Sequence, residues 1–293
     1  MNLATTVLEI TAPVFLLAMT GFTWVKLGFE YRLAFVTRLC MTLAVPCLIF
    51  TAIMQARIEP EALTALSLAA LSAYGAVTVV MLVLVRICGL QMRTHAAPMI
   101  FGNTGNLGLP LALFAFGPEG LSLAVIVFAV MAIWSFTFGV WLVAGGGSPL
   151  RVLREPVVGA TLLGGLFQWR GWETPVFLTN ALELVGQMAI PLMLITLGVA
   201  IARLHPRRLG LAAALAGAKI FICVGLAWTA GLLLNLEPMA HAVLVLQVST
   251  PVAVTSYMLA EKYGADSDAV AGMVVISTLM AAIYLPALLA VLL

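Results

Sequence analysis

Residues 101–110 read Phe-Gly-Asn-Thr-Gly-Asn-Leu-Gly-Leu-Pro, inside a run that is otherwise apolar enough to cross a bilayer. Glycine and proline interrupt the hydrogen-bond ladder of a helix, and in hydrocarbon every freed N–H and C=O needs a partner. Such an interruption survives only where protein or a water-filled cavity surrounds it. Asn103 and Asn106 offer amide donors and acceptors at the same depth. The stretch therefore predicts a broken membrane helix beside a cavity, which is typical of transporter binding sites.

The composition predicts an all-α polytopic membrane protein. Of the 293 residues, 63% are hydrophobic and 9% are charged, and the mean hydropathy is +1.15. A soluble domain carries about 25% charged residues. The basic residues are spread over short loops, which argues against a nucleic-acid partner. The cysteines and histidines have no metal-ligand spacing and no nucleotide-binding motif is present, so we expect no cofactor beyond a coupling proton or sodium ion.

Apolar runs of spanning length divide the chain into ten segments, because a membrane helix needs about 20 apolar residues. The segments fall into two halves of five, residues 1–144 and 153–293, joined by a short glycine-rich turn. The expected spans are 3–23, 33–54, 62–87, 95–116, 120–144, 153–169, 175–202, 207–234, 239–262 and 267–292.

The distribution of basic residues predicts the orientation of these segments. With the N-terminus outside, eleven Lys and Arg residues lie in inner loops or at inner helix ends, and only Arg57 and Arg170 lie outside. Lys219 lies within the membrane. Reversing the chain or losing one helix would remove this asymmetry, so the pattern favours ten helices with both termini on the outer side.

The chain also shows signs of an internal duplication. An apolar frame around Pro46 in the second segment is repeated around Pro191 in the seventh, at an offset of 145 residues, and both prolines are expected to kink their helices. Gly117 and Gly264, after the fourth and ninth segments, stand in similar contexts at an offset of 147 residues. Because five is odd, the second half would enter the membrane upside down. This pattern predicts the inverted repeat of many secondary transporters.

The fourth segment supplies the first candidate binding residues. N–H groups of the half-helix after the break would present a partial positive charge to an anion. Close packing of a glycine-rich helix on a neighbour is the alternative, but it explains only the glycines. The asparagines and the proline favour the binding site. The candidates here are Asn103, Thr104, Gly105, Asn106 and Pro110.

The ninth segment supplies the second set, around Pro251. This proline frees a backbone carbonyl inside the membrane, and nearby hydroxyls can satisfy it. In the duplication the stretch lies opposite the broken part of the fourth segment, so we expect two broken helices to cross and form one site. A simple proline kink repaired by Ser and Thr is the alternative, and the ninth segment alone does not decide between them. The candidates are Gln247, Ser249, Thr250, Pro251 and Thr255.

Two ionisable residues inside apolar runs are candidates for a role in charge or coupling. Lys219 is too deep to reach the membrane surface easily, so it could attract an anionic substrate, serve as a built-in cation, or pair with an acid such as Glu9. Glu9 could carry a coupling proton or make a structural hydrogen bond.

The fourth-segment motif Asn103-Thr-Gly-Asn106-Leu-Gly108-Leu-Pro110-Leu resembles that of the auxin efflux carrier family, which includes bacterial malonate and malate permeases. The stretch Pro251-Val-Ala-x₅-Leu-Ala-x₂-Tyr-Gly264 is similar to the ninth-segment motif of that family. Segment order and overall length also agree, so the resemblance covers the whole chain. Family members often carry Asn soon after the ninth-segment proline, whereas the polar residues here are Thr255 and Ser256. A weaker or different substrate contact is therefore expected.

The resemblance implies two inverted five-helix repeats with the fold of the bile-acid sodium symporters. Segments one, two, six and seven would form a scaffold that can dimerise. Segments three to five and eight to ten would form a moving transport domain, with segments four and nine crossing at their prolines. Asn103, Asn106 and residues around Thr250 and Pro251 would contact the substrate. A bacterial inner membrane is the implied location.

These observations predict a secondary carrier that moves a small organic anion, a carboxylate, by alternating access. The alternative is a sodium-coupled symporter of a larger amphipathic acid, although no acidic residue lies beside either broken motif. An intramembrane enzyme would need a nucleophile and a base at one depth, and Ser249 has no evident histidine partner. The sequence does not choose among the membrane potential, a proton and sodium as the driving force.

Overall fold

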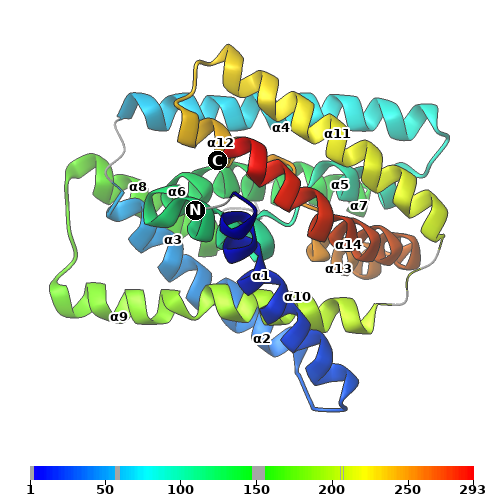
Figure 1. Ribbon diagram of the computed structural model, residues 1–293, viewed down its shortest axis with the longest axis horizontal. Coiled ribbons are helices and arrows are strands. Elements are labelled where there is room, and N and C mark those ends of the chain that lie inside the picture. Colours follow the sequence, from blue (N-terminus) through cyan, green and yellow to red (C-terminus); the bar gives the residue numbers. More distant parts are fainter. Residues whose placement is uncertain (1–2, 57–59, 147–155, 205, 207) are drawn as a thin grey trace.

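The computed structural model describes residues 3–56, 60–146, 156–204, 206 and 208–293. In this part of the chain helices are the only extended regular structure (Figure 1). Three of them, labelled η, are single π-helical turns. In chain order the elements are α1 (Leu3–Lys26), α2 (Leu33–Leu39), η1 (Cys40–Ala44), α3 (Val45–Met54), α4 (Pro60–Ile87), α5 (Met92–Ile100), η2 (Thr104–Gly108), α6 (Leu109–Trp134), η3 (Ser135–Gly139), α7 (Val140–Ala144), α8 (Pro156–Arg170), α9 (Val176–Gln187), α10 (Ala189–Arg203), α11 (Leu209–Leu233), α12 (Pro238–Val248), α13 (Val254–Lys262) and α14 (Ser267–Leu292).

Seven helical stretches among the described residues are long and apolar enough to cross a membrane. This number is lower than the ten segments expected, because the breaks shorten some helices. Helices α5 and α13 have 9 residues each, α12 has 11 and α8 has 15. The run Thr104–Ala144 counts once, although Gly117, with a φ of 68°, turns the chain inside it. Ten crossings and the division at 144 and 153 therefore remain predictions.

Both expected proline kinks appear as irregularities just before the proline. The π-helical turn η1 precedes Pro46, and the helical path is interrupted at Met188 before Pro191. A proline ring cannot accommodate the carbonyl four residues earlier, so the preceding turn has to widen or break. Gly117 and Gly264, which the duplication pairs, both have a φ of 68°. This left-handed conformation favours glycine and ends the helical run at matching places.

The two halves of the chain are interleaved, since α1 packs along α10 and α8 packs along α3. Glycines permit the first of these crossings. A methyl group on Gly198 would collide with the carbonyl oxygen of Ala18, and one on Gly21 would collide with that of Ile195. Small residues allow membrane helices to approach until their backbones touch. Figure 1 also shows α4 and α11 running side by side, and they are in contact.

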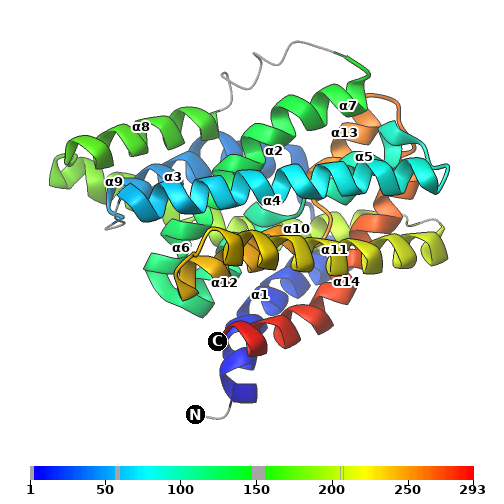
Figure 2. The same ribbon diagram turned by 90° about the horizontal axis from the view of Figure 1, so that it is seen from above.

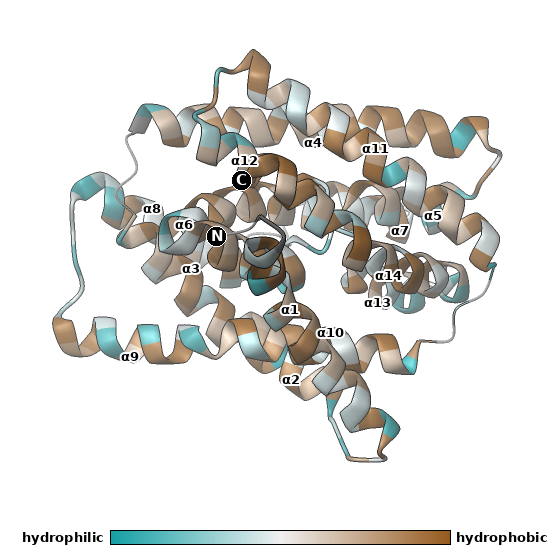
Figure 3. Ribbon diagram, viewed as in Figure 1, coloured by the Kyte–Doolittle hydropathy of each residue, from teal (hydrophilic) through white to brown (hydrophobic). Residues whose placement is uncertain are grey.

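The helix ends separate into two groups along the long axis of the molecule. The C-terminal ends of α4 and α10 lie at one end, and those of α3, α8 and α11 lie at the other (Figure 1). The N-terminal end of α1 and the C-terminal end of α14 lie near each other, as Figures 1 and 2 both show. Hydrophobic residues predominate along the long helices (Figure 3). The glycine-rich turn beyond residue 146 lies outside the described residues, as do Arg57, Arg151, Arg154 and Arg207, which entered the orientation argument.

Candidate functional site at the paired helix breaks

The two breaks predicted from the sequence are present, and they pair with each other. Helix α5 ends at Ile100, and an extended stretch leads to η2, while α12 ends at Val248 and a second extended stretch leads to α13. Gly102 and Val252 form an antiparallel β-bridge. The amide of Asn103 donates to the carbonyl of Pro251 at 2.7 Å, and that of Ala253 donates to the carbonyl of Phe101 at 3.4 Å. Each break thus satisfies polar groups of the other, as a non-helical backbone in a membrane requires.

The crossing differs in one respect from what the family resemblance implies. Pro251 lies at the crossing, but Pro110 lies in the first turn of α6, well past Gly102. The π-helical turn η2 directly precedes α6, as η1 precedes Pro46, so a widened turn again makes room for the proline ring. The close approach at the crossing comes from Gly102 instead, where a methyl group would collide with the Thr250 side chain.

Polar groups from α11 and α14 hold the C-terminal ends of the two short helices. The Lys219 ammonium donates to the carbonyl of Met99 at 2.9 Å, near the end of α5. The Tyr284 hydroxyl donates to the carbonyl of Ser249 at 2.6 Å, at the end of α12. Both carbonyls belong to the last turn of a helix, where C=O groups lack a helical partner and the dipole is negative. The amide of Val252 is satisfied by Ser277 Oγ at 3.0 Å.

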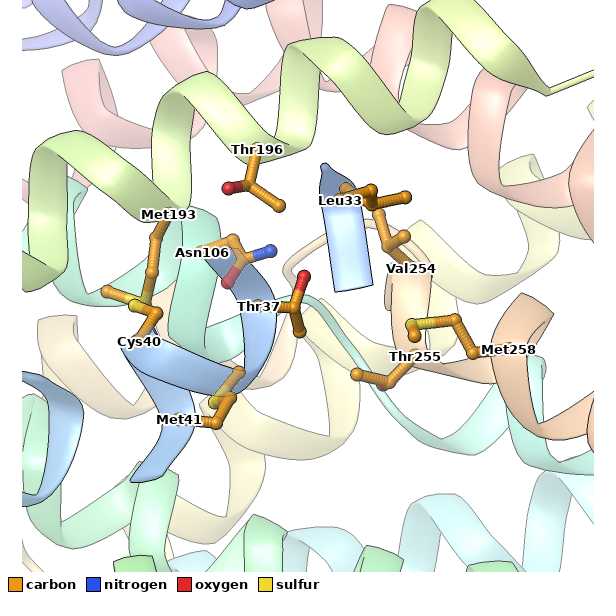
Figure 4. Close-up of a pocket in the computed structure, with 10 residues that line it drawn as sticks. All are labelled: Leu33, Thr37, Cys40, Met41, Asn106, Met193, Thr196, Val254, Thr255 and Met258. Carbon is orange, nitrogen blue, oxygen red and sulfur yellow. The ribbon is translucent and has the colours of Figure 1, made fainter. Parts of the chain in front are cut away.

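A small pocket adjoins the N-terminal ends of the two half-helices that follow the breaks (Figure 4). Its cavity volume is about 30 Å³. Residues of η2 and α13 form one wall, and residues of α2, η1 and α10 form the other. The lining residues are Leu33, Thr37, Cys40, Met41, Asn106, Met193, Thr196, Val254, Thr255 and Met258.

Three polar side chains in this lining have no hydrogen-bond partner in the part of the chain that the structure describes: the Asn106 amide and the hydroxyls of Thr37 and Thr255. Other membrane threonines behave differently. Thr11 and Thr78, for example, donate to the carbonyl four residues earlier. That local bond is the ordinary way for a helical threonine to satisfy its hydroxyl in lipid. The unused groups are therefore available to a water or a ligand in the pocket.

The fourth polar residue of the lining is already engaged. Thr196 Oγ1 and the Tyr31 hydroxyl lie 2.8 Å apart and share a hydrogen bond. Tyr31 belongs to the loop between α1 and α2, and its carbonyl accepts from the Arg203 guanidinium at 2.6 Å. Burial raises the pKa of Tyr31, although the Thr196 bond opposes this, so the phenol stays protonated at neutral pH. These bonds fix the loop against α10 beside the pocket.

The pocket also lies at two helix N-termini without side-chain caps. Asn106 is in the first turn of η2, and Val254 and Thr255 are the first two residues of α13. Neither helix has a hydrogen bond from its N-cap side chain, at Asn103 or Ala253. The N–H groups of a first turn have no helical partner, and the helix dipole makes them partly positive. The arrangement suits a negatively charged ligand.

Of the ten binding residues expected from the sequence, the structure brings Asn106 and Thr255 to the pocket. The other eight lie around the crossing and do not line the pocket. Ser249 and Thr250 bond backbone carbonyls of α12. Buried polar atoms without a hydrogen-bond partner in the described chain occur on three of them, Asn103, Thr104 and Gln247. The Gln247 amide lies against Gly108. The remaining three, Gly105, Pro110 and Pro251, are buried there.

Sequence reasoning missed the opposite wall, formed by Thr37, Cys40, Met193 and Thr196. One signal was available, because Thr37 and Thr196 lie on segments two and seven, within ten residues of the prolines that the duplication pairs.

The two ionisable candidates, Lys219 and Glu9, have different surroundings. Lys219 is 2% exposed and bonded to Met99, whereas Glu9 lies exposed on α1. The alternative in which they pair is therefore wrong. Neither residue lines the pocket.

The comparison with known families agrees with this geometry. A family model described as membrane transport protein matches residues 6–149 and 141–289. The chain belongs to this family. It is the auxin efflux carrier family of the sequence resemblance.

Two relatives are named as uncharacterized transporters. One, from Methanocaldococcus jannaschii, is 27% identical over 197 residues, which cover 61% of this chain and 61% of the relative. The other, from Methanothermobacter thermautotrophicus, is 29% identical over 199 residues, covering 66% of this chain and 65% of the relative. The match thus spans somewhat less than two thirds of either relative.

Proposed function

We propose that this protein is a secondary carrier for a small organic anion, a carboxylate, which binds in the pocket lined by Asn106 and Thr255. One observation carries the proposal: the pocket joins the uncapped N-termini of two half-helices to three unpartnered polar side chains. Helix N-termini and neutral donors bind carboxylate oxygens. No acidic residue lines the pocket, which disfavours a cation as its occupant.

We further propose that the chain crosses the membrane ten times as two inverted repeats. The packing of α1 on α10 and of α8 on α3 supports this. In the expected duplication α1 corresponds to α8 and α3 corresponds to α10, so the two contacts are equivalent. Helices α1–α3 and α8–α10 would form the scaffold, and the rest the transport domain. Arg93 supports such a domain, since it bonds the carbonyls of Val143 and Tyr263 and so connects α5, α7 and α13.

The pocket lies between these two bodies, which is where alternating access requires the site. One wall belongs to the proposed scaffold and the other to the proposed transport domain. If the transport domain moves against the scaffold, the Asn106 wall travels with it and the Thr37 wall stays behind. The substrate would then be released as the two walls separate. Dimerisation through the scaffold helices, which expose Phe35 and Phe177, fits the same division.

Orientation follows from the basic residues. Leu33 and Thr37 lie at the start of α2, just after the loop that contains Arg32, and Met258 lies one turn before Lys262. These pocket residues are thus near the ends that carry the excess of Lys and Arg. By the positive-inside rule those ends are cytoplasmic, with both termini outside in a bacterial inner membrane. The pocket is accordingly closer to the cytoplasm in this conformation.

The alternative is a sodium-coupled symporter of a larger amphipathic acid. It receives support only from the unpartnered oxygens of Thr104 and Gln247 at the crossing, since sodium prefers oxygen ligands. The carrier hypothesis is preferred because a carboxylate usually completes such a cation site and none lies at the crossing among the described residues.

Reconstitution into proteoliposomes tests the proposal. Uptake of radiolabelled organic acids would be measured for the wild type, Asn106→Ala and Thr255→Val. Both substitutions remove a donor from the pocket and leave the helix breaks intact. Thr229→Val is the matched control, because the Thr229 hydroxyl is exposed and bonds only its own helix. We expect the two pocket variants to lose uptake and the control to retain it. Unchanged uptake in Asn106→Ala would remove the site.

A further inference from the structure

We infer that an anionic membrane phospholipid binds in the groove between α1 and α14, with an acyl chain in the groove and its phosphate at Lys26. The inference goes beyond the proposed function, and the groove shares no lining residue with the substrate pocket. Three features support it: the groove is continuous and apolar, its hydroxyl groups are already engaged, and a lysine lies at its end.

Two adjoining cavities form the groove between α1 and α14, which contact each other (Figure 2). Their volumes are about 710 and 330 Å³. Phe15, Met19 and Ala282 line both cavities, so the groove is continuous. On α1 the lining runs from Val7 to Phe22, about 22 Å of helix. An acyl chain crosses one leaflet, about 15 Å, so it can lie in the groove along its whole length.

The groove offers its occupant hydrocarbon contacts and no unused side-chain donor. Two residues of the lining, Thr11 and Thr278, carry hydroxyl groups. Each hydroxyl donates to the carbonyl four residues earlier, at 2.9 and 2.7 Å respectively. Among the described residues, no charged side chain lines the groove. A polar ligand would lose hydrogen bonds to water there without replacement, whereas an acyl chain has none to lose.

A lysine lies where the groove ends on α1. The Lys26 ammonium is 5.4 Å from the centroid of the Phe22 ring, and Phe22 is the last lining residue of that helix. Lys26 is exposed in the last turn of α1, and no carboxylate forms a salt bridge with it in the described chain. Trp24, two residues earlier, is 45% exposed, as is typical of tryptophan at a membrane surface. The ammonium is therefore at the level of lipid headgroups.

The charge at this end of the groove is positive. Besides Lys26, Arg203 lies in the last turn of α10, two residues after Ile201, which lines the groove. The Arg203 guanidinium also donates to the carbonyl of Tyr31 in the loop after α1, which holds it near the end of that helix. Basic residues at the membrane surface attract anionic headgroups. An acyl chain in the groove places the phosphate of the same molecule beside these cations.

The groove also lies between the two bodies of the proposed carrier. Helices α1 and α10 belong to the proposed scaffold, whereas α14 and Leu107 of η2 belong to the proposed transport domain, and all four contribute to the lining. A lipid chain in the groove would thus contact both bodies at once. Binding itself does not depend on this division.

The experiment counts lipids on the full-length protein by native mass spectrometry. The protein is delipidated in detergent and titrated with phosphatidylglycerol or phosphatidylcholine that carry identical acyl chains. Lys26→Gln removes the ammonium, and Ala282→Phe fills the groove at an exposed residue that lines both cavities.

Each variant has a matched control. Lys262→Gln removes an ammonium that also lies 5.4 Å from the centroid of an aromatic ring, that of Tyr263, which does not line the groove. Ile283→Phe adds a ring at the exposed neighbour of Ala282, outside the lining.

We expect the wild type and both controls to bind one phosphatidylglycerol more tightly than phosphatidylcholine. Lys26→Gln should bind phosphatidylglycerol about 5-fold more weakly, which is the contribution of one lysine near an anionic surface. Ala282→Phe should lose this lipid.

Equal affinity of the wild type and Lys26→Gln for phosphatidylglycerol would overturn the inference, and so would equal affinity of the wild type for the two lipids. Binding that survives in Ala282→Phe would place the lipid elsewhere. A dimer that Ala282→Phe abolishes would assign the groove to a second copy of the chain. If Ala282→Phe does not fold, Lys26→Gln still decides, because Lys26 is exposed. Because no transport is measured, none of these results bears on the proposed function.

Discussion

The backbone amide of Asn103 donates to the carbonyl of Pro251 at 2.7 Å, and this bond joins two helix breaks that are almost 150 residues apart in the sequence. Because main-chain atoms make the connection, it does not depend on the identity of either side chain. The bond does require the two backbones to come close together. Gly102 permits this approach, because a methyl group at this position would collide with the Thr250 side chain.

Substitution of Gly102 should therefore destabilise the crossing. We expect Gly102→Ala to lower the free energy of unfolding by about 1–3 kcal/mol, the usual cost of overpacking a dense interior. Thermal unfolding in detergent measures the change. Thr250→Ala removes the nearest atom in conflict and should restore part of the loss in the double variant. If the two substitutions are simply additive, the steric explanation is wrong.

Lys219 should contribute to stability through its bond to Met99. A hydrogen bond that involves a charged group is worth about 1.5–3 kcal/mol, and Lys219→Met removes it while keeping a side chain of similar length. Lys219→Gln retains a donor, so we expect it to be more stable than Lys219→Met. The same unfolding assay ranks the three proteins. Equal stability of wild type and Lys219→Met would show that the ammonium contributes nothing to the end of α5.

Thr37→Val should impair transport without harming the fold. Valine has the shape of threonine, and the Thr37 hydroxyl has no partner in the described chain, so unfolding should not become easier. A lost bond to a charged substrate costs about 1.5–3 kcal/mol, which corresponds to roughly 10- to 100-fold weaker binding. The ratio of the half-saturation concentrations of the variant and the wild type, measured from the concentration dependence of uptake, gives this factor. Thr161→Val is the control, because the Thr161 hydroxyl bonds a carbonyl of its own helix. An unchanged half-saturation concentration would exclude Thr37 from the site.

Cys40 offers a chemical probe of the pocket. Its thiol is buried in the lining, whereas Cys88 is exposed to solvent and would react first. In a Cys88→Ser background, a small thiol reagent that enters the pocket should inactivate uptake, and added substrate should slow the inactivation. A Cys40→Ala version of the same protein should resist the reagent. Equal inactivation with and without Cys40 would place the reactive thiol elsewhere.

The sequence predicted the breaks because their causes are local. Gly102, Asn103 and Pro251 cannot continue a lipid-exposed helix, whatever surrounds them. The similar contexts of Gly117 and Gly264 also have a local cause, since both glycines have a positive φ, while the duplication itself stays a prediction. The point of crossing was predicted less accurately, because Pro110 lies past the break, directly after η2, and not at the crossing.

The pocket could be predicted only in part. Asn106 and Thr255 were found because they lie on the broken segments. Thr37 was not, because a threonine in a membrane helix normally bonds the carbonyl four residues earlier, and nothing local distinguishes one that does not. Which threonines keep a free hydroxyl depends on how α2 and α10 approach the half-helices, and that is decided by contacts between distant parts of the chain.

The contrast between the two walls suggests how selectivity could be redesigned. One wall is fastened by main-chain bonds between residues 101–103 and 251–253, so its donors are held whatever is changed across from them. The facing wall consists of ordinary side chains on intact helices, such as Thr37 and Met193. Exchanging Met193 and the other apolar residues of this wall should change which substrate is preferred, while Asn106 and Thr255 stay in place.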